Sequence, residues 1–512
     1  MLAWTIYISF LGALAVMLLP RHAAALARKV ALLAAVADLL VSLAGFAQFK
    51  SGELLTVARC PWVPSLGIQY HLAADGISIT LVLLTGLAAV AGILFSWNIE
   101  HRAREFFAFY LALIGGVYGV FLSFDLFLLF VFYEIAIIPK YFLIAIWGST
   151  RREYGAMKLA LYSFAGSALV LAGLIAAYVV SGAHSFDLND LAAAGFSRSF
   201  QMWAFPLVFV GFAILAGLWP FHTWAPTGHV AAPTAASMLL AGVVMKLGAY
   251  GCLRVAMTLF PDGMADWGFG VLGLHSWREV FALLAVIGIV YGAMVALVQQ
   301  DFKFVIGYSS VSHMGFVLLG LMTLNLTGLA GSVLQMFSHG VIAGLLFAVV
   351  GRMVYDRTHT RDLPQLSGMH LSRALPFAAG TFVIAGMASM GLPGFSGFVA
   401  ELQVVMGAWK SFPLMAVATG AGILIGVAYT LRAVQLAFFG DGRKSGGGHG
   451  TAHVPAPPRH ELPPISVPER CGAALLIAAT VLIGLFPGLL LDKIVASFDS
   501  PLFAWLQKGG NP

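Results

Sequence analysis

Apolar segments of membrane-spanning length follow one another along almost the whole chain of 512 residues. A helix needs about 20 apolar residues to cross the hydrocarbon core of a bilayer. We count fourteen such segments, and the pattern predicts an all-α polytopic membrane protein without a sizeable soluble domain. The segments begin near residues 2, 30, 73, 105, 124, 159, 203, 236, 277, 304, 326, 374, 412 and 470.

Proline and glycine interrupt the seventh and the twelfth segment. Pro220, Pro226 and Pro233 precede the eighth segment, and each removes a backbone donor from a helix. The twelfth segment contains the string Gly-Leu-Pro-Gly at residues 391–394. Helices broken at matching positions of two halves indicate inverted repeats around an ion path, because freed backbone groups inside a bilayer must face protein or water.

These breaks divide a single membrane domain, residues 1–512, into successive parts. We expect helices one to three in residues 2–97, and helix fourteen in 470–490, after a glycine- and proline-rich stretch, 441–468, that is typical of a flexible cytoplasmic loop. Between them we expect two repeats, helices four to eight in 105–257 and helices nine to thirteen in 277–440.

Lys and Arg residues predict the orientation of the helices. An even number of crossings puts both termini on one side of the membrane. With the termini outside, the inside loops carry seventeen Lys and Arg and the outside segments carry eight. Cytoplasmic loops of membrane proteins hold the excess of basic residues. We therefore expect a multi-pass protein of the bacterial inner (plasma) membrane with both termini on the periplasmic side.

Composition narrows the function classes. Hydrophobic residues make up 60% of the chain and charged residues 10%, and the mean hydropathy is +0.91. The net charge of +6 comes from short loops and forms no basic stripe, so we expect the lipid bilayer and no nucleic acid as a partner. Cys60, Cys252 and Cys471 are isolated, which argues against an iron–sulfur cluster or a disulfide framework. The Gly-x-Gly-x-x-Gly string at 268–273 lacks a preceding strand, and we interpret it as chance.

Three charged side chains fall deep inside the predicted helices, namely Glu134, Lys246 and Glu401. A charged side chain at the centre of a membrane helix costs roughly 2.5–3.5 kcal/mol on insertion scales, and such residues mark ion and proton paths. We therefore predict that all three carry protons. A static carboxyl with satisfied hydrogen bonds is the alternative for Glu134.

Four histidines are further candidates for chemistry. His313 and His339 lie near the middle of the tenth and eleventh segments, where a neutral imidazole relays a proton between its two nitrogens. A hydrogen bond between two helices is the alternative for each. His222 and His229 lack an acidic or cysteine partner for a metal or haem, so we expect them to order a loop or contact water.

The chain resembles the antiporter-like membrane subunits of respiratory complex I, and within them the subunit M branch, the counterpart of mitochondrial chain 4. The resemblance covers nearly the whole length, and its strings lie at residues 70–78, 134–148, 220–251, 301–303, 309–315 and 391–394. It implies fourteen helices, two inverted five-helix repeats and broken helices seven and twelve. It also implies proton translocation driven by remote redox chemistry.

The resemblance assigns roles to particular residues. The helix-five glutamate of the family matches Glu134, the helix-eight lysine matches Lys246, and the helix-twelve carboxylate matches Glu401. The helix-seven lysine of the family is absent, because its expected place is occupied by Leu215. We predict that Lys140 replaces this lysine as the cation that stabilises Glu134. A lysine that only extends its ammonium to the inside interface is the alternative.

The missing lysine leaves three functions open. The chain is a proton-translocating membrane-arm subunit of NADH:quinone oxidoreductase, a structural spacer of that arm that does not pump, or a subunit of a cation/proton antiporter or membrane-bound hydrogenase-type complex. In the first case the resemblance implies neighbouring antiporter-like subunits as partners and no cofactor in this chain. NADH, FMN, iron–sulfur clusters and quinone then belong to partner subunits.

Overall fold

The computed structural model describes residues 1–267, 270, 273–440 and 462–508, and within them the protein is a helical bundle with one small β-hairpin. The rejected glycine string at 268–273 and the loop at 441–468 both lie partly outside the described residues. The strands are β1 (Leu55–Val63) and β2 (Ile68–Ala74), and four π-helical segments are η3 (Leu240–Val244), η4 (Cys252–Met257), η6 (Val349–Tyr355) and η7 (Gln435–Phe439). The α-helices are α1 (Trp4–Leu18), α2 (Ala24–Gln48), α3 (Gly76–Phe95), α4 (Ala103–Leu122), α5 (Leu126–Trp147), α6 (Arg152–Ser181), α7 (Leu188–Ala193), α8 (Arg198–Ala216), α9 (Trp224–Ala231), α10 (Thr234–Leu239), α11 (Met245–Gly251), α12 (Trp277–Val298), α13 (Phe302–Met322), α14 (Leu326–Ala348), α15 (Asp356–Thr358), α16 (Leu363–Leu366), α17 (Leu371–Ala374), α18 (Pro376–Ser389), α19 (Ser396–Ser411), α20 (Pro413–Val434), α21 (Val467–Leu485), α22 (Gly488–Ser497) and α23 (Ala504–Lys508).

Long apolar helices agree with the predicted membrane protein. In the described part of the chain, twelve helical stretches are long and apolar enough to cross a membrane, and α1 and α18 are shorter apolar helices. The α-helical structure is interrupted at residues 217–223 between α8 and α9 and at residues 390–395 between α18 and α19. The run α10–η3–α11–η4 continues as one helical stretch from Thr234 to Met257.

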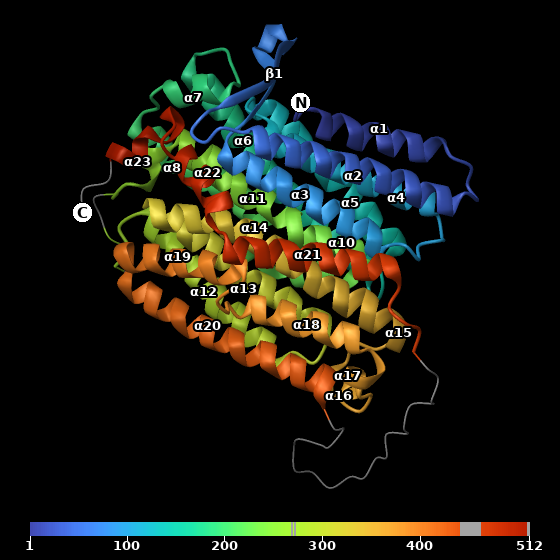
Figure 1. The fold of residues 1–512 in the computed structure, drawn as a ribbon. Helices are drawn as coiled ribbons and strands as arrows, with labels where there is room; N and C mark the ends of the chain where they lie inside the picture. Colours follow the sequence, from blue (N-terminus) through green and yellow to red (C-terminus); the bar gives the residue numbers. More distant parts are fainter. Residues whose placement is uncertain (268–269, 271–272, 441–461, 509–512) are drawn as a thin grey trace.

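The two ends of the bundle carry different elements (Figure 1). The β-hairpin, α7, α23 and the start of α1 gather at one end, which we call the hairpin end. The short helices α15, α16 and α17 lie at the opposite end, which we call the α15–α17 end. The first and last described helices thus begin and finish near the same end of the molecule.

The hairpin, which the hydropathy pattern did not predict, packs against the loop that precedes α7. The β2 residue His71 contributes Nδ1, which lies 2.6 Å from Asp187 Oδ2, and Arg59 of β1 pairs with the same oxygen at 3.3 Å. Burial alone would raise the pKa of the Asp187 carboxyl. The hydrogen bonds from His71 and Asn189 and the charge of Arg59 outweigh burial, and the pKa lies below its usual value.

Two similar local structures, which we call clasps, occur at opposite ends of the bundle. Each combines an Asp that caps a helix with an isolated β-bridge at that Asp. Asp125 caps the first turn of α5, and the chain beside it pairs with the chain at Asp187 through an isolated antiparallel bridge. Asp301 caps the first turn of α13 in the same way, and its bridge partner is Asp362. The first clasp lies beside the hairpin and the second beside α16, so equivalent local structures begin helices of opposite direction.

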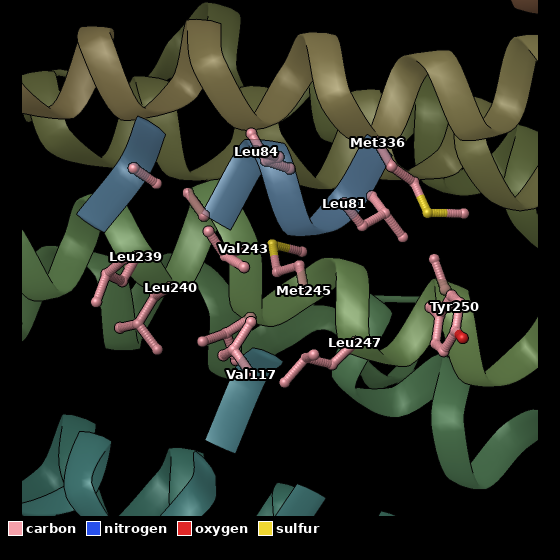
Figure 2. Packing of buried hydrophobic residues seen from close by; sticks show 14 of the residues in the cluster. Leu81, Leu84, Val117, Leu239, Leu240, Val243, Met245, Leu247, Tyr250 and Met336 are labelled. Carbon is pink, nitrogen blue, oxygen red and sulfur yellow. The ribbon is translucent and has the colours of Figure 1, made fainter. Parts of the chain in front are cut away.

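The most buried helices lie in the middle of the bundle. Helices α3, α11, α13 and α14 are almost completely buried, whereas α1, α2, α6 and α20 leave large apolar side chains exposed. Figure 2 shows Leu81 and Leu84 of α3 and Met336 of α14 gathered with Val243 and Met245 of the η3–α11 stretch. Because apolar contacts fill this centre, a polar side chain on α11, α13 or α14 must find its partners within the protein.

A buried ion pair ties α3 to the η4 segment near the hairpin end. Arg254 Nη2 donates to Asp75 Oδ2 at 2.5 Å, and both side chains are buried. Arg254 also donates to the hydroxyl of Tyr250 at 3.2 Å, and its guanidinium lies over the ring of Phe124. Asp75 caps α3 by accepting a hydrogen bond from the Ser78 amide.

We predict that Arg254→Met destabilises the folded protein by about 3–5 kcal/mol, because it leaves the Asp75 carboxylate buried without its cation. Thermal unfolding of the purified protein in detergent measures the loss. Arg59→Met is the matched control, since Arg59 is half exposed and such pairs contribute only about 0–1 kcal/mol. Equal losses in the two variants would contradict the prediction.

Candidate functional site

Lys246 occupies the centre of the bundle on α11, directly after the π-helical segment η3. Its side chain is completely buried. The ammonium donates to the Ala241 carbonyl oxygen and lies 2.8 Å from His339 Nδ1. Among the described residues no carboxylate pairs with it. A lysine held by an imidazole has a partner that accepts a proton when neutral and repels the ammonium when protonated.

The two predicted histidines lie next to each other. His313 comes from α13 and His339 from α14, and their rings stack with centroids 5.4 Å apart. His313 Nδ1 lies 2.9 Å from Glu401 Oε1, and its Nε2 lies 3.2 Å from Ser389 Oγ at the end of α18. His339 Nε2 is buried and has no hydrogen-bond partner in the part of the chain that the structure describes.

Glu401 lies beside the interruption between α18 and α19. The chain leaves α18 through Gly391, whose φ of +70° suits glycine, while the Leu392 amide returns to the Met387 carbonyl. A Cβ at Gly391 would come within 3.0 Å of Glu401 Oε2, so the glycine also leaves space for the carboxylate. Gln335 of α14 donates to Glu401 Oε1 at 3.3 Å.

A small cavity of about 10 Å³ adjoins the His313 and Glu401 side chains. This volume is about enough for one water molecule. Tyr429 of α20 lines it, and the hydroxyl of Tyr429 lies 2.7 Å from Ser309 Oγ of α13. The row Lys246, His339, His313 and Glu401 therefore runs from α11 through α14 and α13 to α19 and ends at a polar cavity beside a helix break.

Glu134 and Lys140 form a separate group on α5. Lys140 is completely buried, and its ammonium has no hydrogen-bond partner among the described residues. Lys140 and Ser167 of α6 are the polar groups that interact with the Glu134 carboxylate, although Lys140 does not form a close ion pair with it. Neither Glu134 nor Lys140 contacts Lys246 in the described residues. The structure brings together four of the six candidate residues and leaves these two apart.

Leu215 is buried in α8, where its backbone packs against Gly248 of α11. A Cβ at Gly248 would lie 3.0 Å from the Leu215 carbonyl carbon, so α8 and α11 approach closely. The expected place of the absent lysine is thus inside the core next to the helix that carries Lys246. Lys140 lies on α5 and therefore does not occupy the position of the absent lysine, which is on α8.

His222 and His229, which we expected to order a loop or contact water, are both buried in helical segments. His222 is buried in the short helix Phe221–Thr223, where its ring packs on Tyr291 at 5.2 Å. His229 is fully buried inside α9. Pro226 lies inside α9, whereas Pro220 and Pro233 directly precede the helices Phe221–Thr223 and α10. No group of three or more His, Cys, Asp or Glu placed to hold a metal is present in the described ranges.

Among the buried polar groups missed as candidates are Lys303 and Asp38. Lys303 was counted among the loop cations, yet it is only 2% exposed. Asp38 of α2 is buried and accepts a hydrogen bond from Ser9 of α1 at 2.7 Å. An acidic residue within an apolar segment is a signal that the sequence did offer for Asp38. Lys303 gave no such signal, because it stands beside Asp301 at the start of a helix.

Comparison with known proteins decides the family. A family model described as the transmembrane part of NADH:quinone oxidoreductase and Mrp antiporters matches residues 123–426. The chain belongs to this family. Among its members, NADH-quinone oxidoreductase subunit M of Rhodobacter capsulatus is 36% identical over 482 residues, which cover 91% of this chain and 89% of the relative. NAD(P)H-quinone oxidoreductase chain 4 3 of Picosynechococcus sp. is 39% identical over 401 residues, covering 78% of this chain and 70% of the relative. The resemblance predicted from the sequence strings is confirmed.

Solved structures of the family share the fold. A chain of respiratory complex I from Thermus thermophilus superposes with a TM-score of 0.86 at 27% identity, and the match covers 100% of both chains. A chain of the Mrp complex from Dietzia sp. DQ12-45-1b gives a TM-score of 0.82 at 20% identity, covering 99% of this chain and 98% of that one. The second likeness concerns the fold alone.

Proposed function

We propose that this chain is a proton-translocating membrane-arm subunit of an NADH:quinone oxidoreductase, assembled beside other antiporter-like subunits. Relatives named subunit M and chain 4 of that enzyme support the assignment. The observation that carries the transport role is the hydrogen bond between buried Lys246 and His339, which continues through stacked His313 to Glu401. Each group in this row is able to gain and lose a proton.

The row is suited to moving one proton at a time. Protonated Lys246 passes its proton to His339 Nδ1. The resulting imidazolium disfavours protonation of Lys246 again until the proton has left His339. Transfer from His339 to His313, whose rings stack 5.4 Å apart, requires a bridging water or a ring movement, and His313 then passes the proton to the Glu401 carboxylate. Remote electron transfer must supply the driving force, because one charge moved against 100 mV requires about 2.3 kcal/mol. NADH, FMN, iron–sulfur clusters and quinone belong to partner subunits in this proposal.

We interpret the bundle as two inverted five-helix repeats, residues 105–257 and 277–440, within about fourteen crossings. The paired clasps at Asp125 and Asp301 support this interpretation, since they begin α5 and α13 at opposite ends of the bundle. The interruptions before α9 and α19 are the corresponding broken helices seven and twelve. By the excess of basic residues, the α15–α17 end faces the cytoplasm and both termini face the periplasm.

A structural spacer that does not pump is the second candidate. One observation favours it, namely that Leu215 leaves the expected lysine position apolar and buried. Without that cation, Lys140 and Ser167 are the groups of the described residues that stabilise the Glu134 carboxylate. The three variants that follow separate a pump from a spacer.

Lys246→Met is expected to remove the proton uptake that this chain contributes while assembly survives. Methionine keeps the length and apolar packing of the side chain but cannot titrate. Proton uptake per electron by the purified complex in liposomes measures the effect. The amount of chain in the purified complex is the control for assembly, and unchanged uptake would rule out Lys246 as a proton site.

Glu401→Gln is expected to lower proton uptake, because glutamine keeps the hydrogen-bonding shape but cannot ionise. Its amide group remains able to meet Gln335 and His313, so the break beside α19 should keep its structure. Glu401→Asp keeps the charge and serves as the control in the same liposome assay. Parental pumping in both variants would leave the carboxylate with a packing role only.

Lys140→Met is expected to reduce proton uptake if Lys140 replaces the lysine absent at Leu215. Adding Leu215→Lys in the double variant should restore part of the uptake, because it returns a cation to the position that the family uses. Leu215→Lys alone is the control for damage to the tight contact with Gly248. Normal uptake in Lys140→Met would show that Lys140 only packs against its surroundings.

A further inference from the structure

A cavity of about 370 Å³ opens at the α15–α17 end of the bundle. Side chains from five distant parts of the sequence meet around it, among them Ser96, Ser149, Thr234, Asp356 and Lys303. The cavity is large enough for several water molecules, and its lining combines charged and hydroxyl side chains with apolar ones. It is separate from the small cavity beside Glu401.

Lys303 stands at an electrostatically unfavourable place beside this cavity. It is the second residue of α13, and its amide donates to the capping carboxylate of Asp301 at 2.9 Å. A helix N-terminus carries a partial positive charge, which disfavours a cation. The side chain is nevertheless buried rather than extended into the solvent.

The ammonium of Lys303 reaches the end of the broken helix α9. It donates to the Ala232 carbonyl oxygen at 3.0 Å, directly after the last residue of α9. The two preceding carbonyl oxygens already accept hydrogen bonds. The Ser149 hydroxyl and Arg361 donate to the Val230 carbonyl, and the Ser149 amide donates to the Ala231 carbonyl. The partial negative charge at this helix end offsets the unfavourable start of α13.

One buried imidazole links Lys303 to the central row. His229 of α9 interacts electrostatically with both Lys303 and Lys246. It is fully buried, and both of its ring nitrogens are without hydrogen-bond partners among the described residues. Lys303 therefore lines the 370 Å³ cavity and interacts electrostatically with a buried, unpaired imidazole on which Lys246 also acts. The charged groups that act on Lys303 are Asp301, Asp356 and Arg361.

We propose that Lys303 is the proton-loading residue at the neck between the 370 Å³ cavity and the buried Lys246 row. Its neutral amine takes a proton from cavity water and becomes an ammonium held by the Ala232 carbonyl. It then releases that proton to His229 through an intervening water and returns to the amine. This inference deepens the proposed function and rests on it, because it supplies the row from the α15–α17 end.

Lys303→Met and Lys303→Arg test the proposal in the assembled complex in liposomes. Both variants are expected to lower proton uptake to the level of Lys246→Met. Methionine removes the charge, whereas arginine keeps a cation at the end of α9 but does not release its proton. If Lys303 only stabilised that helix end, Lys303→Arg would pump normally, and this result would overturn the proposal. Lys29→Met, an exposed lysine on α2, is the control for loss of one positive charge.

Failure of this inference differs from failure of the proposed function. Normal uptake in Lys303→Met with reduced uptake in Lys246→Met overturns the loading role and leaves the proton-pumping assignment intact. Normal uptake in Lys246→Met instead removes the assignment itself, and the loading role with it.

Water access to the cavity gives a measurement that does not depend on pumping. Thr234→Cys, in a chain with Cys60 and Cys471 replaced by serine, is treated with a water-soluble methanethiosulfonate. The proposal expects labelling from the side on which the exposed control Thr150→Cys also reacts. A Thr234→Cys thiol that stays unlabelled from that side would overturn the proposal, including in the event that Lys303→Met does not assemble.

Discussion

Peptide groups freed at the helix breaks must be satisfied inside the protein, and the rest of the structure depends on how this is done. A bilayer core supplies no water for a free carbonyl. At the end of α8 the Trp224 ring donates to the Ile214 carbonyl at 2.8 Å, and at the end of α9 the donors come from Ser149, Arg361 and Lys303. These donors belong to separate elements, so each break holds its neighbours in position. The α10–α11 helix that carries Lys246 follows directly from this arrangement.

The central row differs from an ordinary buried ion pair. A lysine facing a carboxylate would keep both charges fixed, because separating them inside the protein is costly. Lys246 instead faces the imidazole of His339, and the only carboxylate of the row, Glu401, lies beyond the second histidine. A proton gained or lost by Lys246, His339, His313 or Glu401 therefore always has another polar group of the row beside it. Gln335, which reaches both His313 and Glu401, holds their geometry.

Hydropathy and proline content predicted the helical membrane fold, and intramembrane charge predicted Lys246 and Glu401 as buried polar residues. Spacing along the sequence was insufficient to tell which candidates meet, because His313 and His339 approach through packing of α13 on α14. Lys303 and His229 were misplaced for a related reason. Prolines and a neighbouring aspartate indicated a loop, whereas the tertiary structure buries both side chains. The hairpin was missed because its strands lie between strong helical signals, and β2 leads almost directly into the apolar helix α3.

The separation of Glu134 and Lys140 from the central row has a consequence for energy conservation. A continuous wire of proton sites from one face of a membrane to the other would discharge the gradient that other subunits build. In the described structure no hydrogen bond joins the α5 pair to Lys246. Buried Leu215 on α8, beside the helix that carries Lys246, adds no proton-carrying group to that region. An interval without such groups conducts protons only when water enters it, which limits leakage of the gradient while the complex is at rest.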